Sequence, residues 1–107
     1  MSEFANLYET VIDRKLNPEE GSYTAYLYAK GEEKILKKVG EECTEVIIAS
    51  LSQDKEHLIG ELADLQYHLM VLMAQKDVTL EELEEELSRR SQKKHNLKAE
   101  RKPITNL

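Results

Sequence analysis

Apolar residues recur at intervals of three and four along most of the chain, and no segment shows the strict alternation of a half-buried strand. Glycine occurs four times and proline twice, so little interrupts the helical pattern. The pattern predicts an all-α protein, a small helical bundle without strands. The expected helices run over about Glu3–Leu16, Tyr23–Lys30, Glu32–Ser52, from an Asp54 cap to Gln75, and over about Leu80–Lys94.

Capping and helix-breaking residues separate these segments. Asn17–Gly21 interrupts the helical pattern, Ser22 is placed to cap the second helix, and Gly31 is placed to end it. Thr79 and Glu82 have the spacing of a capping box for the last helix. The link between the third and fourth helices is very short, so we expect them to form a long antiparallel hairpin.

Length and composition narrow the class of protein. The 107 residues suit a single domain, with the tail from about residue 95 loosely ordered. A net charge of −6 argues against nucleic acid or an anionic membrane as a partner. The single cysteine, Cys43, is expected in the core. No signal peptide or membrane-spanning stretch is found, so export is not predicted.

One helix carries more apolar surface than a small monomer could hide. Leu69–Ala74 is apolar on every side of the fourth helix, which predicts a homo-oligomer, either a dimer or a tetramer. The alternative is that this helix is buried within its own monomer. On the last helix, Leu83 and Leu87 are expected to face inward.

Two acidic pairs occupy matching positions on the third and fourth helices. Glu42 and Glu45 are three residues apart, as are Glu61 and Asp64, so each pair can direct two carboxylates to one place. On a helical wheel, Glu42 and Glu61 each lie about 20° from an apolar stripe. An antiparallel hairpin can therefore gather four carboxylates in a partly buried groove.

Crowded carboxylates repel one another unless some of them protonate or a cation joins them. An all-oxygen site favours a hard ion, Mg²⁺ or alternatively Mn²⁺. Gly40 and Gly60, which weaken helix interiors, suggest a close approach of another group beside the acids. The alternative is that the acids merely solvate two helix faces.

The three histidines are weaker signals. His57 and His68 lie four residues before Glu61 and four after Asp64, so either could touch a substrate. A hydrogen-bonded structural role is the simpler interpretation of each, because neither has the spacing of a metal motif. His95 lies in the basic tail and is expected to be exposed.

Several segments resemble a known family. Glu41–Glu45 followed by Glu61–Asp64 is similar to the paired-acid signature of the all-α, MazG-type nucleotide pyrophosphatases. Within that superfamily, Ser22–Thr24, Lys34–Glu42 and Ala63–Leu69 resemble the phosphoribosyl-ATP pyrophosphatase family. The resemblance implies hydrolysis of 1-(5-phosphoribosyl)-ATP to the AMP derivative and pyrophosphate, the second step of histidine biosynthesis. It also implies a cytoplasmic, oligomeric, Mg²⁺-dependent enzyme.

The resemblance also implies roles for individual residues. The metal ligands would be Glu42, Glu45, Glu61 and Asp64, and Glu41 would bind a second ion, orient water or act as general base, unless it simply faces solvent. The expected substrate-binding residues are Ser22, Tyr23, Thr24, Lys34, Lys37 and Lys38. Arg89, Arg90 and Lys93 could also meet phosphates, although salt bridges to glutamates explain every one of these cations equally well.

Details within this segment leave alternatives open. Tyr23 could pack on the base or ribose, or it could be a core aromatic residue. Ser22 and Thr24 are poor nucleophiles, because no histidine is tied to either by a motif. Two rival functions remain: a house-cleaning hydrolase of other nucleoside triphosphates, and a non-catalytic helical dimerisation module.

Overall fold

The computed structural model of the chain describes residues 2–93, and this part folds into five α-helices. The helices are α1 (Glu3–Leu16), α2 (Tyr23–Lys30), α3 (Glu32–Leu51), α4 (Lys55–Gln75) and α5 (Leu80–Ser91). The all-α prediction is confirmed, and α1, α2 and α4 have the predicted bounds. The third helix ends one residue early and the last ends before Lys94. The predictions for the tail and for His95 lie outside the described residues.

The predicted caps are present. The Ser22 hydroxyl accepts a hydrogen bond from the Ala25 amide at 3.2 Å. Thr79 and Glu82 form both bonds of a capping box at the start of α5. Gly31 has φ of 94°, a backbone conformation that favours glycine, and its amide donates to the Leu27 carbonyl at 3.0 Å. Gly31 can therefore end α2 and start α3 without an intervening loop.

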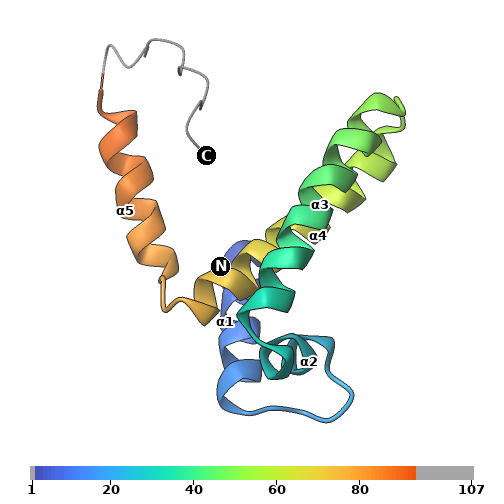
Figure 1. Cartoon of the computed structure of the whole chain (residues 1–107). Coiled ribbons are helices and arrows are strands. Elements are labelled where there is room, and N and C mark those ends of the chain that lie inside the picture. The colour runs from blue at the N-terminus through green and yellow to red at the C-terminus, as the bar shows by residue number, and fades with distance from the viewer. Residues whose placement is uncertain (1, 94–107) are drawn as a thin grey trace, which may run out of the picture.

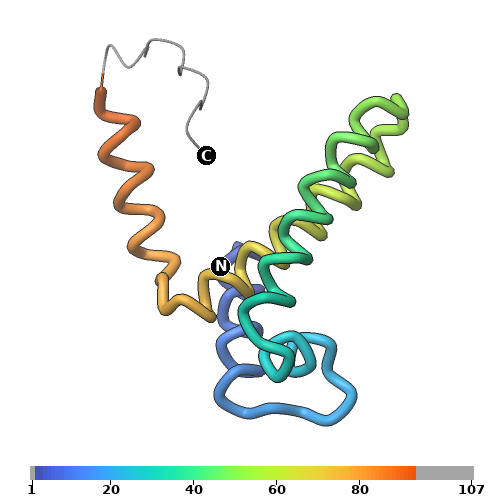
Figure 2. The backbone as a smooth tube through the Cα atoms, viewed as in Figure 1, coloured from blue at the N-terminus to red at the C-terminus, as the bar shows by residue number. Residues whose placement is uncertain are grey.

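Helices α3 and α4 form the predicted hairpin and run side by side as one long arm (Figure 1). The smooth backbone trace shows how tightly the chain reverses between them (Figure 2). Gln53 takes a positive φ of 64° in this reversal, and the Asp54 side chain then accepts bonds from the amides of Glu56 and His57. The tight link sets the register in which α3 and α4 face each other.

The hydrophobic core lies at the base of this arm, where α1 and α2 pack against α3 and α4. Its buried members are Val11, Leu27, Ile35, Met70, Val71 and Ala74. Polar contacts secure the same region. The Tyr28 hydroxyl donates to the Val11 carbonyl at 2.9 Å, and the Lys15 ammonium donates to the Ala74 carbonyl at 2.8 Å. Among the described residues, only the two hairpin helices make up the outer half of the arm (Figure 1).

The apolar run on α4 is covered by the chain itself. Met70, Val71 and Ala74 are buried, and Leu69, Leu72 and Met73 are partly buried. Because α1 packs against α4, the buried members of the run need no second subunit, and the alternative of burial within the monomer holds for them. Self-association itself stays a prediction.

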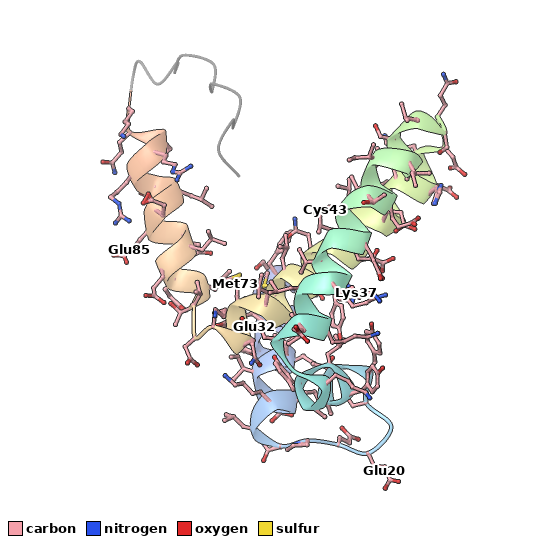
Figure 3. The ribbon with its side chains drawn as sticks, viewed as in Figure 1. Glu20, Glu32, Lys37, Cys43, Met73 and Glu85 are labelled. Atoms are coloured by element: carbon pink, nitrogen blue, oxygen red, sulfur yellow. The ribbon has the colours of Figure 1, made fainter. Side chains whose placement is uncertain are left out.

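Two further expectations about burial are wrong. Leu83 and Leu87 are 42% and 56% exposed, because α5 points away from the arm and makes no extended contact with another described helix (Figure 1). Cys43 is exposed near the middle of α3 (Figure 3). It lies about 40° past Val39 on the helical wheel, beyond the stripe that faces α4. Within residues 2–93, no helix is both long and apolar enough to cross a membrane.

Candidate metal centre

The hairpin brings three of the four predicted ligands together. Glu42 on α3 and Glu61 and Asp64 on α4 each offer a carboxylate oxygen, and these atoms all lie within 4.8 Å of one another. The side chains of Glu42 and Glu61 are only 13% and 18% exposed, whereas Asp64 is open to solvent. The antiparallel packing therefore creates a group of three carboxylates, in which Glu42 and Glu61 are largely buried and Asp64 faces solvent.

The electrostatics of this group favour a cation. Partial burial raises the pKa of Glu61, and the charges of Asp64, Glu42 and Glu45 raise that pKa further. His57 opposes the effect from 3.6 Å, the distance between its Nε2 and a Glu61 oxygen. Three hard oxygen donors in such a place are the donor set that Mg²⁺ or Mn²⁺ prefers. The chemistry of these residues therefore fits a divalent ion.

Glu45 and Glu41 stand outside the close group. Glu45 is exposed, yet its charge acts on Glu61. Glu41 is 46% exposed and accepts a hydrogen bond from the Lys38 ammonium at 3.2 Å, which lowers the pKa of Glu41. This contact favours the surface role of Glu41 that the sequence left open.

Lys38 is the lysine that reaches the acids. Its Nζ lies 3.9 Å from a Glu42 oxygen. The hydrogen bond to Glu41 raises the pKa of Lys38, burial opposes this effect, and the charges of Glu41 and Glu42 add to it. Lys34 and Lys37 act on Glu41 only through their charges. Figure 3 shows Lys37 on the same stretch of α3. The structure thus distinguishes Lys38, which the sequence could not separate from its neighbours.

A second cluster lies where the start of α2 meets α4. Tyr23 is 45% exposed, and its ring stacks 5.9 Å from that of Tyr26 and 6.3 Å from that of Tyr67. The interpretation of Tyr23 as a core aromatic residue is therefore wrong. His68, which is 5% exposed, meets the Tyr23 and Tyr67 rings edge-on at 6.1 and 4.9 Å.

The hydroxyls of the Ser22–Thr24 segment serve the fold. Ser22 caps α2, as described above, and buried Thr24 shares a hydrogen bond with the Tyr67 hydroxyl. Sequence reasoning missed Tyr67, although a tyrosine beside a histidine in an apolar helix was a usable signal. Tyr23 is the member of this segment with surface available to a ligand, and the substrate-binding role of all three residues stays a prediction.

Other candidate residues have simpler explanations. Arg89 and Arg90 both pair with Glu86 on α5, at 2.8 and 3.6 Å, so the salt-bridge interpretation is confirmed for these two. Within residues 2–93, a Cβ built on Gly40 or Gly60 would meet no atom within 4 Å beyond its chain neighbours and the adjoining backbone of its own helix. The space beside both glycines is open in the described part of the chain, so the expected close approach of another group stays a prediction.

Fold and site together define an all-α protein with a group of close carboxylates between the two helices of a hairpin. A family model described as phosphoribosyl-ATP pyrophosphohydrolase matches residues 4–91. The chain belongs to this family.

Curated relatives agree over nearly the full length of the chain. A phosphoribosyl-ATP pyrophosphatase of Clostridium acetobutylicum is 55% identical over 96% of this chain and 94% of its own. Proteins of the same name from Clostridium botulinum and Bacillus cereus are 53% and 54% identical, covering 95% and 84% of this chain and 93% and 84% of their own.

Proposed function

We propose that the chain hydrolyses 1-(5-phosphoribosyl)-ATP to 1-(5-phosphoribosyl)-AMP and pyrophosphate, the second step of histidine biosynthesis. The observation that carries the proposal is the group formed by Glu42, Glu61 and Asp64, in a chain of the phosphoribosyl-ATP pyrophosphohydrolase family. A non-catalytic helical module would have no need for two shielded carboxylates beside each other, because shielded charges of one sign destabilise a fold unless a cation joins them.

We assign the metal site to Glu42, Glu61 and Asp64, with Glu45 as a fourth ligand after a change of rotamer. Glu45 lies one turn along α3 from Glu42, and its charge already reaches Glu61. Once bound, Mg²⁺ or Mn²⁺ would neutralise phosphate charge and lower the pKa of a water ligand. The open side at Asp64 leaves room for the substrate.

In this proposal, the lysine beside the acids positions the phosphates, and water is the nucleophile. Lys38 is placed to contact a phosphate oxygen, because its Nζ lies at the edge of the carboxylate group. The oxygen of water adds to the α phosphorus, the bond from that phosphorus to the bridging oxygen breaks, pyrophosphate leaves with the bonding electrons, and the proton of the water passes to solvent. Ser22 and Thr24, whose hydroxyls are engaged in the fold, play no nucleophilic part.

The direct test measures pyrophosphate release, with Mg²⁺ present, from phosphoribosyl-ATP beside a panel of ordinary nucleoside triphosphates. We expect strong preference for phosphoribosyl-ATP and loss of the activity in Glu45→Gln. Glu85→Gln, the same charge change on α5, serves as the matched control and should remain active (Figure 3). Preference for another triphosphate would keep the metal assignment and make the protein a house-cleaning hydrolase.

We further propose that the chain forms a homo-oligomer through the outer half of the arm. Exposed apolar side chains gather there without a covering helix in the described chain. They are Ile47 (63% exposed), Ile48 (51%), Leu51 (79%), Ile59 (55%) and Leu62 (41%). Surfaces of this kind mark association sites. Because this arm also carries the acids, each metal site would lie near the interface between subunits.

The size of the protein in solution tests this association. Leu62→Glu is expected to reduce the mass measured by light scattering to that of one chain. Leu16→Glu, on the 72%-exposed residue at the end of α1, should leave the mass unchanged. A single-chain mass for the unmodified protein would refute the association.

The exposed free thiol of Cys43 suits a reducing compartment, which supports a cytoplasmic location.

A further inference from the structure

The buried ring of His68 has one nitrogen that the fold uses and one that it does not. Nδ1 lies 2.8 Å from the backbone carbonyl oxygen of Asp64, one turn earlier on α4. A carbonyl can only accept, so Nδ1 carries the hydrogen and donates it. In the neutral ring Nε2 is then an acceptor, and its partner must be a hydrogen-bond donor.

Within the described part of the chain, that donor is missing. Nε2 is buried and has no hydrogen-bond partner there, and the residue as a whole is only 5% exposed, so bulk solvent does not supply one. A buried polar atom left unpaired costs about 1–3 kcal/mol, and native proteins pair nearly all such atoms. An orphaned acceptor of this kind beside a reactive centre points to a ligand as the source of the donor.

His68 lies next to the candidate metal centre. It follows Asp64 by four residues on the same face of α4, which places it about 6 Å further along the helix axis. Tyr23, nearly half exposed, lies against the ring of His68, with the two ring centroids 6.1 Å apart. Asp64, His68 and Tyr23 therefore lie next to one another.

We propose that Nε2 of His68 accepts a hydrogen bond from a hydroxyl of the ribose that links the adenine to the triphosphate of the bound nucleotide. The inference rests on the proposed function, in which the phosphates lie at the carboxylates. This ribose is bonded to the α phosphate, so it must occupy the space next to the acids. Because Nε2 is buried in the free protein, a neighbouring side chain must shift to admit the sugar, and the half-exposed Tyr23 ring, in edge-on contact with the imidazole, is the residue we assign to this movement.

Two substitutions separate the two nitrogens of His68. In His68→Asn, the side-chain amide stands where Nδ1 was, so it can still donate to the Asp64 carbonyl but cannot replace Nε2. In His68→Gln, the amide reaches the position of Nε2 and gives up the bond to Asp64. Thermal melts of both variants report any damage to the fold, independently of the reaction.

The reaction is measured as kcat/KM for phosphoribosyl-ATP and for its analogues that lack the 2′ or the 3′ hydroxyl of that ribose. For the unmodified enzyme, we expect at least one analogue to react roughly tenfold or more slowly, the loss that follows from removing one partner of a buried hydrogen bond. In His68→Asn, the ratio of kcat/KM for phosphoribosyl-ATP to kcat/KM for this analogue should fall towards one. In His68→Gln, much of the preference for phosphoribosyl-ATP should remain. If His68 were purely structural, its replacement would lower kcat/KM equally for all substrates. An unchanged ratio in His68→Asn would therefore overturn the proposal.

A spectroscopic measurement keeps the inference testable if phosphoribosyl-ATP is not the substrate. Adding the AMP-derivative product or AMP, with Mg²⁺, to protein labelled with ¹⁵N in histidine should move the Nε2 resonance of His68 and leave Nδ1 in place. The 2′- and 3′-deoxy forms of AMP identify the hydroxyl. Release of pyrophosphate from another triphosphate with this shift present would refute the proposed substrate alone. A bound nucleotide that leaves Nε2 unmoved would refute the role of His68.

Discussion

Replacing Glu42 by glutamine removes one charge from the carboxylate group and keeps the size of the side chain. Because the group brings Glu42, Glu61 and Asp64 within 4.8 Å, the unmodified protein should gain stability when Mg²⁺ binds. At a Mg²⁺ concentration one hundred times the Kd, the gain is about 2.7 kcal/mol. For a chain of this length, that corresponds to a rise in Tm of roughly 10 °C or more.

Loss of one of three close ligands should weaken binding strongly. If the Kd of Glu42→Gln is a hundredfold higher, the same Mg²⁺ concentration adds only about 0.4 kcal/mol, and the rise in Tm shrinks to about 2 °C. The assay is a thermal melt with and without Mg²⁺ at constant ionic strength, which removes general screening effects.

A matched control separates the site from the overall charge. Glu85→Gln makes the same change on α5, which points away from the arm (Figures 1 and 3). This variant should keep the full Mg²⁺-dependent rise. An equal rise in Glu42→Gln and in the unmodified protein would refute the assignment of the ion to this group, and the absence of any rise in the unmodified protein would refute the metal site itself.

Three other changes test the fold and the site. Leu27→Ala, in the core, should lower the free energy of unfolding in urea by about 2–5 kcal/mol, whereas Leu16→Ala at an exposed position should change it by less than about 0.5 kcal/mol; similar losses would contradict the described core. Thr79→Ala should weaken α5 locally by about 1 kcal/mol and speed amide exchange there while the global Tm stays nearly constant, because α5 packs extensively against no other helix of residues 2–93; a large fall in Tm would show that α5 is packed. The raised pKa of Glu61 means that, without metal, its contribution to stability is present below its ordinary value of 4.5 and is lost as pH rises through the folded pKa. Mg²⁺ affinity measured by calorimetry should therefore rise with pH through a pKa above that ordinary value, and Glu61→Gln should remove this dependence.

Local signals predicted the helices well. Ser22, Gly31 and Thr79 act through groups within a few residues of themselves, so their spacing in the sequence was sufficient to place both ends of α2 and the start of α5. The matched acid pairs also predicted that Glu42, Glu61 and Asp64 lie close together. This succeeded because the short link forces the third and fourth helices to pack against each other.

The failures arose where a distant element decides the outcome. A helical wheel shows that Leu83 and Leu87 share a face, but it cannot show that no described helix covers that face. For the same reason, the wheel could not show that α1 packs against α4, where Val71 is fully buried. Nor could spacing show that His68 uses Nδ1 and leaves Nε2 unpaired, since this depends on the surrounding side chains.

The short link between α3 and α4 also bears on how the candidate centre assembles during folding. Glu42 and Glu61 are joined through one tight reversal at Gln53, so bringing them together closes only a small loop and loses little chain entropy. Contacts of such low sequence separation form early and rapidly. The acids can meet before α1 has docked on α4, and the repulsion among them then opposes hairpin formation from the first moments of folding. A divalent ion present at that stage would act on the rate of folding as well as on the stability of the finished protein.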